Sequence, residues 1–212
     1  MLTVCEWILQ QIGQYCQQHN ILFCVDAIQS LGALPMDVQD INADCIIADG
    51  HRWLISPEGL GVFYCRDSLL EQLKPSQFGW HMTEVLYNFD ALEWRPAQNA
   101  RKFECGSPNM LGVHALHSSV SLILEHGIEK ITRQLLANTR YLADKLKQLP
   151  DINIMSNLSR DRLSSIIAFR HSQLSSEAIY QALIEKKSHL RHASWQCTFF
   201  RQCKLNCVSA LI

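Results

Sequence analysis

The chain has 212 residues, of which 48% are hydrophobic and 18% are charged, and its formal net charge at pH 7 is −1. A chain of this length and composition can bury a core, in one large domain or two small ones. The near-neutral charge gives no electrostatic footprint for nucleic acid or for an anionic membrane surface, so we predict neither partner.

The N-terminus has no basic region followed by an apolar run, so no signal peptide is predicted, and no apolar stretch approaches the length of a membrane span. Nine cysteines are scattered along the chain without a tight framework. This pattern favours reduced thiols and a cytoplasmic location.

The first elements of the chain are a helix and two strands. Residues 4 to 19 carry apolar side chains near helical spacing and predict a helix. Two short apolar runs, Ile21 to Val25 and Cys45 to Ala48, are typical of buried parallel strands. The runs end at Asp26 and Asp49, and parallel strands present such residues at their carboxyl ends. We therefore expect both acids at the rim of a site.

The middle of the chain begins with a strand, Gly61 to Cys65, and continues as a long irregular segment, residues 66 to 108. Long loops in compact domains are usually functional. From Met110 to His126 and from Ile128 to Leu149, apolar residues recur every three or four positions, with Gly127 between the two runs. This spacing predicts two consecutive helices.

The last third of the chain predicts two strands and a helix. Ile152 to Met155 and Ser164 to Phe169 have strand-like apolar patterns. A helix through about Lys187 is expected to begin with Ser175 as its cap and Glu177 in its first turn.

A run of motifs in this order resembles one known family. The motifs are Val25-Asp26-Ala27-Ile28-Gln29-Ser30-Leu31-Gly32, Asp37-Val38, Asp49-Gly50-His51-Arg52-Trp53-Leu54, Pro57-Glu58-Gly59-Leu60-Gly61, Phe63-Tyr64, and Arg101-Lys102-Phe103-Glu104-Cys105-Gly106-Ser107-Pro108-Asn109. They closely resemble the core of the class V aminotransferases, a pyridoxal phosphate (PLP) family that includes the cysteine desulfurases. The resemblance extends from about residue 4 to about residue 187.

This resemblance implies an α/β fold in three parts. Residues 1–109 would form part of the PLP-binding large domain, with a mostly parallel sheet. Residues 110–187 would form a small α+β C-terminal domain, and residues 188–212 a divergent tail. Members of the family are considerably longer, and in them the part that would precede residue 1 holds the PLP phosphate and stacks on its ring. We therefore expect an N-terminally truncated chain.

By the same resemblance, Asp26 pairs with the pyridine nitrogen of PLP, which keeps that nitrogen protonated so that the ring can accept electrons. Gln29 would contact the phenolic oxygen of the ring. The residues alone leave other interpretations open. Asp26 could cap the turn that begins at Ala27, and Gln29 could be an ordinary polar loop residue.

The phosphate-binding residues implied by the resemblance are His51 with Asp49, and Gly106 with Ser107. Many relatives carry a hydroxyl at the position of Asp49, whereas a carboxylate there repels phosphate unless it is protonated or turned away. His51 could instead bond a carbonyl at a strand end. In the family, the Gly-hydroxyl pair reaches the phosphate of the other protomer, which implies a dimer. The local sequence by itself favours a plain turn at Gly106.

Arg52 occupies the position of the family's Schiff-base lysine. Lysine can supply a neutral amine, whereas a guanidinium stays protonated near neutral pH and forms no imine. Arg52 could represent a natural loss of function, an engineered trap, or a cation that now pairs with phosphate, Asp26 or Asp49. We favour natural loss. Lys102 is the nearest substitute amine in the sequence, but the family geometry gives no reason for it to reach the cofactor.

The tail loses the family pattern, as a divergent tail or a wrong reading frame would. Arg191 stands about where relatives place an arginine that clamps the substrate carboxylate. Cys197 is a candidate persulfide acceptor by proximity alone. A zinc site is not predicted, because no close Cys-x-x-Cys pair is present among His192, Cys197, Cys203 and Cys207.

These observations predict a class V aminotransferase-like protein that is catalytically impaired. Its ancestral reaction would be PLP-dependent imine chemistry on a small amino acid, of the aminotransferase or cysteine desulfurase type. It would form a homodimer or pair with an intact relative. The alternative is a non-catalytic interaction protein that retains the family's dimer surface. The substrate, and the choice among aminotransferase, desulfurase and epimerase, stay open.

Overall fold

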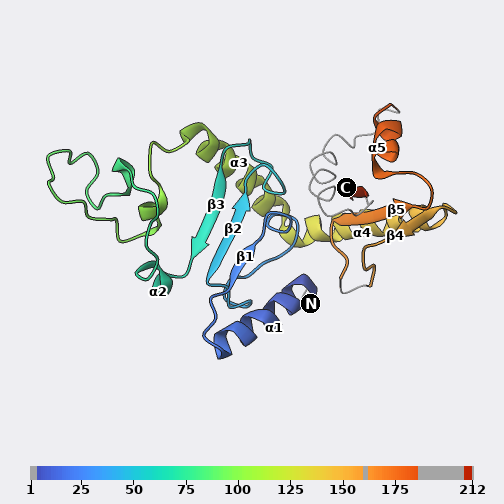
Figure 1. Ribbon diagram of the computed structural model, residues 1–212, viewed down its shortest axis with the longest axis horizontal. Coiled ribbons are helices and arrows are strands. Elements are labelled where there is room, and N and C mark those ends of the chain that lie inside the picture. The colour runs from blue at the N-terminus through green and yellow to red at the C-terminus, as the bar shows by residue number, and fades with distance from the viewer. Residues whose placement is uncertain (1–3, 160–161, 186–207, 212) are drawn as a thin grey trace. The chain divides into compact units, whose positions relative to one another are not determined.

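A computed structural model describes residues 4–159, 162–185 and 208–211 (Figure 1). The chain forms two compact units, one of Glu6–Ile128 and one that contains Glu129 and the residues after it. The helix that begins at Met110 lies in the first of these units.

The first unit contains a helix, α1 (Val4–Gln18), and a three-stranded sheet of β1 (Cys24–Asp26), β2 (Cys45–Asp49) and β3 (Gly61–Cys65), in the order β1-β2-β3 (Figure 1). The predicted helix and the three neighbouring strands are confirmed. β1 and β2 are parallel, but β2 and β3 are antiparallel.

The expectation of a mostly parallel sheet is therefore wrong for the residues that the structure describes. A parallel pair needs a long crossover connection, whereas the segment between β2 and β3, residues 50–60, is a turn that reverses the chain. Gly59 adopts a φ of +86° in this turn, which glycine does without strain.

One face of the sheet supplies the core of the unit. Val25, Ile46 and Ala48 are buried and pack in a cluster with Ile41, which has no exposed surface. Leu9 of α1 packs against the same cluster. Burying a side chain such as Ile41 stabilises the fold by about 1.5–3 kcal/mol.

The opposite face of the sheet carries the alternate residues of each strand, because successive side chains of a strand point to opposite sides of the sheet. Ile47 and Phe63, which are partners in the β2–β3 register, are 42% and 41% exposed. The strand residues that alternate with the core residues are Cys24, Asp26, Cys45, Ile47, Asp49, Phe63 and Cys65.

The segment after β3 is largely irregular, as predicted. It contains a short helix, α2 (Asp67–Leu70), and two single-turn 3₁₀ helices, η1 (Trp80–Met82) and η2 (Ala100–Phe103). The unit then continues into α3 (Met110–His126), whose predicted limits are confirmed.

The second unit contains α4 (Ile128–Lys147), β4 (Ile152–Ile154), β5 (Ile166–His171), α5 (Ser176–Glu185) and β6 (Val208–Leu211). The predicted helices and the first two strands are confirmed, whereas β6 was not predicted. Its sheet, in the order β4-β5-β6, is antiparallel throughout. Phe169 on β5 is buried against Leu142, Leu146, Ile152 and Ile179.

No helix in the described part of the chain combines the length and the apolar character that crossing a membrane requires.

Candidate functional site

The carboxyl ends of β1 and β2 lie at the same edge of the sheet, because the two strands are parallel. Asp26, the last residue of β1, pairs with Ile47, and β2 ends two residues later at Asp49. The chain turns away from β1 through a hydrogen bond from the amide of Ala27 to the carbonyl of Ile47, at 2.8 Å. The structure thus brings Asp26 and the Asp49–Arg52 segment to one edge.

Asp26 uses one carboxylate oxygen locally. Its Oδ1 accepts a hydrogen bond from the amide of Ile28 at 3.1 Å, so the aspartate does stabilise the turn that follows it. The residue remains exposed on the open face of the sheet. Its capping role is therefore compatible with contact to a bound group.

Two turns meet behind this edge. Gly32 has a φ of +92°, and a Cβ added to it would lie 2.5 Å from the carbonyl oxygen of Trp53. No side chain fits between the two backbones at this distance. The turn after β1, residues 27–34, therefore packs directly against the turn after β2, residues 50–56.

The turn after β2 is held by backbone hydrogen bonds. The amide of Gly50 donates to the carbonyl of Leu60 at 2.8 Å, and the amide of Ser56 donates to the carbonyl of Gly50 at 2.9 Å. Inside this frame, the amide of Ile55 donates to the carbonyl of Arg52 at 3.1 Å. Ile55 has a φ of +56°, a conformation that costs a β-branched residue about 1–2 kcal/mol. The frame therefore holds His51 and Arg52 in a defined, locally strained turn.

Three buried polar atoms on these two turns have no hydrogen-bond partner among the described residues. They are Oε1 of Gln29, Nε of Arg52 and Oγ of Ser56. Each such atom lowers the free energy of unfolding by about 1–3 kcal/mol when it is left without a hydrogen-bond partner. This concentration indicates a place where a polar group can bind. Ser56 was missed in the sequence, because a serine after the recognised motif carries no signal of burial.

Asp49 and His51 lie close together without a hydrogen bond. The distance from His51 Nδ1 to Asp49 Oδ2 is 3.8 Å, and the two side chains are 29% and 53% exposed. Asp49 is thus neither buried nor neutralised by a short contact, and its carboxylate opposes the binding of phosphate nearby.

Gly106 and Ser107 are exposed, and no atom lies within 4 Å of a Cβ built on Gly106. They precede Asn109, whose Oδ1 accepts a hydrogen bond from the amide of Gly112 at 3.0 Å and so caps α3. Asn109 Nδ2 also donates to the carbonyl of Gly59 at 3.3 Å. This contact ties the segment before α3 to the turn between β2 and β3.

Lys102 is buried, and its Nζ donates to the carbonyl oxygen of Leu70. This ammonium group is thus already bound to backbone. Arg191, His192, Cys197, Cys203 and Cys207 lie outside the described residues. Within the described ranges, no cluster of His, Cys, Asp or Glu could hold a metal ion.

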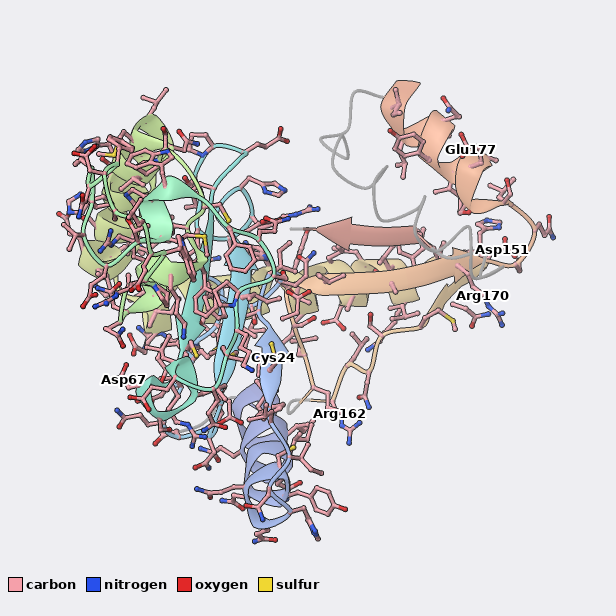
Figure 2. The ribbon with its side chains drawn as sticks, turned by 60° about the vertical axis from the view of Figure 1, so that its left-hand side comes forward. Cys24, Asp67, Asp151, Arg162, Arg170 and Glu177 are labelled. Carbon is pink, nitrogen blue, oxygen red and sulfur yellow. The ribbon has the colours of Figure 1, made fainter. Side chains whose placement is uncertain are left out.

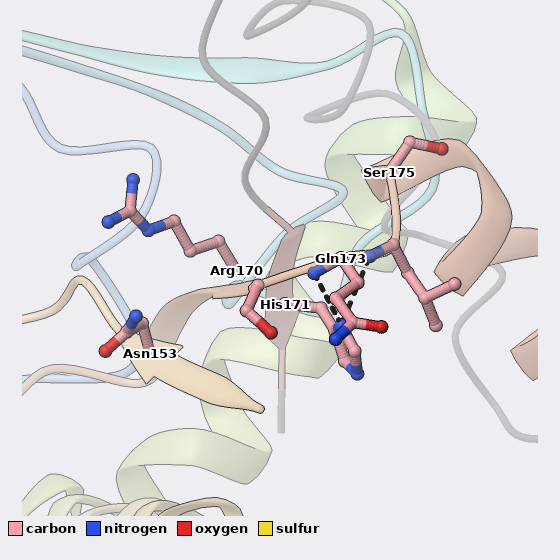
Figure 3. A pocket seen from close by; sticks show the side chains of 7 residues that line it. Asn153, Arg170, His171, Gln173 and Ser175 are labelled. Carbon is pink, nitrogen blue, oxygen red and sulfur yellow. Dashed lines mark hydrogen bonds between the residues drawn. The ribbon is translucent and has the colours of Figure 1, made fainter. Parts of the chain in front are cut away.

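A separate cavity of about 500 Å³ lies in the second unit and includes none of the residues predicted for the site (Figure 3). It is lined by residues of β4, β5 and the loop that leads to α5. At its wall, His171 Nδ1 accepts hydrogen bonds from the amides of Gln173 and Leu174, both at 3.1 Å. The imidazole therefore organises the loop.

Comparison with known proteins establishes the family. The family model for aminotransferase class-V matches residues 7–207, so the chain belongs to this family. It is 29% identical over 178 residues to a probable cysteine desulfurase from Streptomyces coelicolor, covering 84% of this chain and 42% of that protein. It is 27% identical over 172 residues to one from Borreliella burgdorferi, covering 81% of this chain and 40% of the relative.

Solved structures show the same fold. The cysteine desulfurase CsdA from Escherichia coli superposes with a TM-score of 0.80 at 22% identity, covering 96% of this chain and 50% of that one. The apo cysteine desulfurase from Thermococcus onnurineus gives a TM-score of 0.79 at 22% identity, with the same coverage. The chain thus spans about half the length of the proteins that it matches.

The residues present fit contacts to the ring of PLP but not covalent attachment of PLP. An exposed carboxylate at the end of β1 suits the protonated nitrogen of a pyridine ring, and the buried, unpartnered amide oxygen of Gln29 can accept a hydrogen bond from a phenol O–H group. A guanidinium at residue 52 does not suit covalent attachment, because it has no neutral amine to offer.

Proposed function

We propose that this chain is a cysteine desulfurase-like member of the class V family that holds PLP noncovalently and does not turn over amino acids. Arg52 supports the proposal most directly. It follows His51 in the family motif, and its Nε is buried without a partner among the described residues. A buried guanidinium donor suits a phosphate or carboxylate oxygen rather than an aldehyde carbon.

The proposed contacts use residues of both turns. Asp26 faces the ring nitrogen, Gln29 the phenolic oxygen, and His51 the phosphate. PLP when bound supplies an electron-accepting ring, but the chain supplies no amine to link it. Gly106 and Ser107 would contact the phosphate of a second protomer, and Arg191 a substrate carboxylate.

Borohydride reduction tests this proposal, because it converts an imine into a stable bond. The protein is incubated with PLP, reduced and digested, and pyridoxyl-lysine is mapped by mass spectrometry. Equilibrium dialysis on the unreduced sample measures noncovalent binding, with Asp26→Ala as the matched variant. We expect saturable binding that Asp26→Ala weakens, and no stoichiometric adduct. A stoichiometric adduct on Lys102 or another single lysine contradicts the proposal, as does an absence of saturable binding.

The exposed apolar residues of α3 favour a second candidate, a non-catalytic interaction protein that keeps the family's dimer surface. Leu111 and Leu122 lie on one face of this helix and are 82% and 59% exposed, and large exposed apolar groups mark interaction surfaces when they gather. The other exposed apolar residues on this helix are Met110, Val113 and Leu124.

Sedimentation velocity at several protein concentrations tests this second candidate. We expect a dimer, and Leu111→Glu is expected to shift it toward monomer. A wild-type chain that sediments as a monomer throughout rules the candidate out.

A further inference from the structure

Three cysteines form one row across the first sheet. Cys24 on β1 pairs with Cys45 on β2, and Cys45 pairs in turn with Cys65 on β3. Directly paired residues place their side chains on the same face of a sheet. All three are free thiols, with Cys24 exposed, Cys45 buried and Cys65 between these extremes (Figure 2 labels Cys24).

Cys45 on β2 and Cys65 on β3 are direct register partners in the antiparallel pair. Cys65 Sγ donates to the carbonyl of Arg66 at 3.5 Å. Paired residues of antiparallel strands have Cα atoms about 4.5–5.5 Å apart, within the roughly 4.4–6.8 Å that a disulfide spans. A bond between these sulfurs therefore needs little backbone movement.

An ion pair beside the thiols fixes their register. Arg66 Nη2 lies 2.6 Å from Asp44 Oδ1, and the amide of Arg66 donates to the carbonyl of Asp44 at 2.9 Å. The other carboxylate oxygen of Asp44 accepts from the amide of Phe23 at 2.7 Å. Residues 44 and 45 are thus held opposite residues 66 and 65, which keeps Cys45 and Cys65 in direct register on the same face of the sheet.

We propose that Cys45 and Cys65 are a modification site, a thiol pair that a peroxide oxidises to a cross-strand disulfide. Cys65, the more exposed of the two, gives up its proton and attacks one peroxide oxygen as a thiolate. The O–O bond breaks, a sulfenic acid forms, and the departing hydroxide takes up the proton that Cys65 lost, giving the first water. The sulfur of Cys45 then attacks the Cys65 sulfur, the S–O bond breaks, and the departing hydroxide takes the Cys45 proton. Two thiols and one hydrogen peroxide become one disulfide and two waters.

A metal site is the competing use of three thiols in a row. No group of three His, Cys, Asp or Glu side chains in the described part of the chain has the geometry to hold a metal ion. The row therefore favours pairwise sulfur chemistry over coordination.

Peptide mapping without reduction tests the pair. The protein is treated with hydrogen peroxide, quenched with catalase, unfolded with iodoacetamide present, digested and analysed by mass spectrometry. We expect a Cys45–Cys65 linked peptide that has lost two hydrogens and is absent from untreated protein. Cys24→Ser is the matched control and should retain the link, whereas Cys65→Ser should lose it.

Several outcomes overturn the proposal. They are a Cys24–Cys45 link in place of the expected one, sulfinic or sulfonic acid on Cys65 with Cys45 alkylated, and bridges between chains only. The wild-type map decides among them without a variant, so a failure of Cys65→Ser to fold does not obstruct the test. PLP plays no part in this readout. A failure of Cys45 and Cys65 to form a disulfide is therefore distinguishable from a failure of the proposed function.

Discussion

The carboxylate of Asp49 lies 3.8 Å from the imidazole of His51, at the end of β2 where the family motif implies a phosphate contact. A ligand phosphate that approaches His51 therefore also approaches an anion that is half exposed. A carboxylate at this position opposes the binding of a phosphate at His51.

Asp49→Thr is expected to tighten PLP binding. Two charges about 4 Å apart interact by about 1 kcal/mol in water and by more at lower dielectric, and the exposure of Asp49 favours the low value. We expect the dissociation constant for PLP to fall about fivefold, with a smaller gain at high salt. Equilibrium dialysis measures it, with the distant exposed carboxylate variant Asp90→Asn as control. Equal tightening in both variants would show a general charge effect.

Arg52→Lys is expected to leave the chain without turnover. The substitution supplies an amine, but an amine reacts efficiently only when the aldehyde is held at near-attack geometry, an effect of about 7–11 kcal/mol. Asp49 still opposes the phosphate that would provide this hold. Sulfide release from cysteine and transamination measure activity, and borohydride trapping shows whether Lys at position 52 has reacted. Measurable turnover by the single variant contradicts the prediction, and Arg52→Lys with Asp49→Thr shows whether the acid is the remaining obstacle.

Asn109→Ala is expected to destabilise the first unit by about 1–2 kcal/mol, because it removes both the cap of α3 and the hydrogen bond to Gly59. Asn109→Asp keeps the capping oxygen and loses the amide donor, so its effect should be smaller. Thermal unfolding followed by circular dichroism measures both. If the two variants lose the same stability, the capping oxygen contributes nothing.

Stability is expected to fall at alkaline pH through Cys45. Burial raises the pKa of the Cys45 thiol from 9.0 to about 12, and the hydrogen bond to Cys65 adds to the shift. The unfolded thiol therefore ionises first, so this contribution is complete below pH 9 and is lost as the pH rises toward 12. Urea unfolding from about pH 8 to about pH 10.5 should show a shallower pH slope for Cys45→Ala than for wild type. Val25→Ala, a buried truncation without an ionisable group, should keep the wild-type slope.

Local patterns predicted most of the elements, and long-range contacts account for the errors. The apolar run from Ile21 predicted a strand, but β1 begins at Cys24. The amide of Phe23 bonds the carboxylate of Asp44 rather than a neighbouring strand, and no local pattern shows this. The direction of β3 and the pairing of β6 with β5 depend on partners distant in sequence, so periodicity could not indicate them.

The part of the candidate site that lies at the ends of predicted strands could be predicted from the sequence. Asp26 and Asp49 reach one edge because they end parallel strands, and that follows from sequence. The burial of Gln29 Oε1 and Arg52 Nε could not be predicted from the sequence, because it depends on how the two turns pack. The roles assigned to Asp26, Gln29, His51, Gly106 and Ser107 stay predictions.

The contact between Gly32 and the backbone of Trp53 has a consequence for how this family can change. Main chain packed against main chain leaves no room for a side chain at residue 32, so this constraint acts on the turn whatever side chain residue 52 carries. A substitution at residue 52 therefore leaves this constraint on the backbone in place.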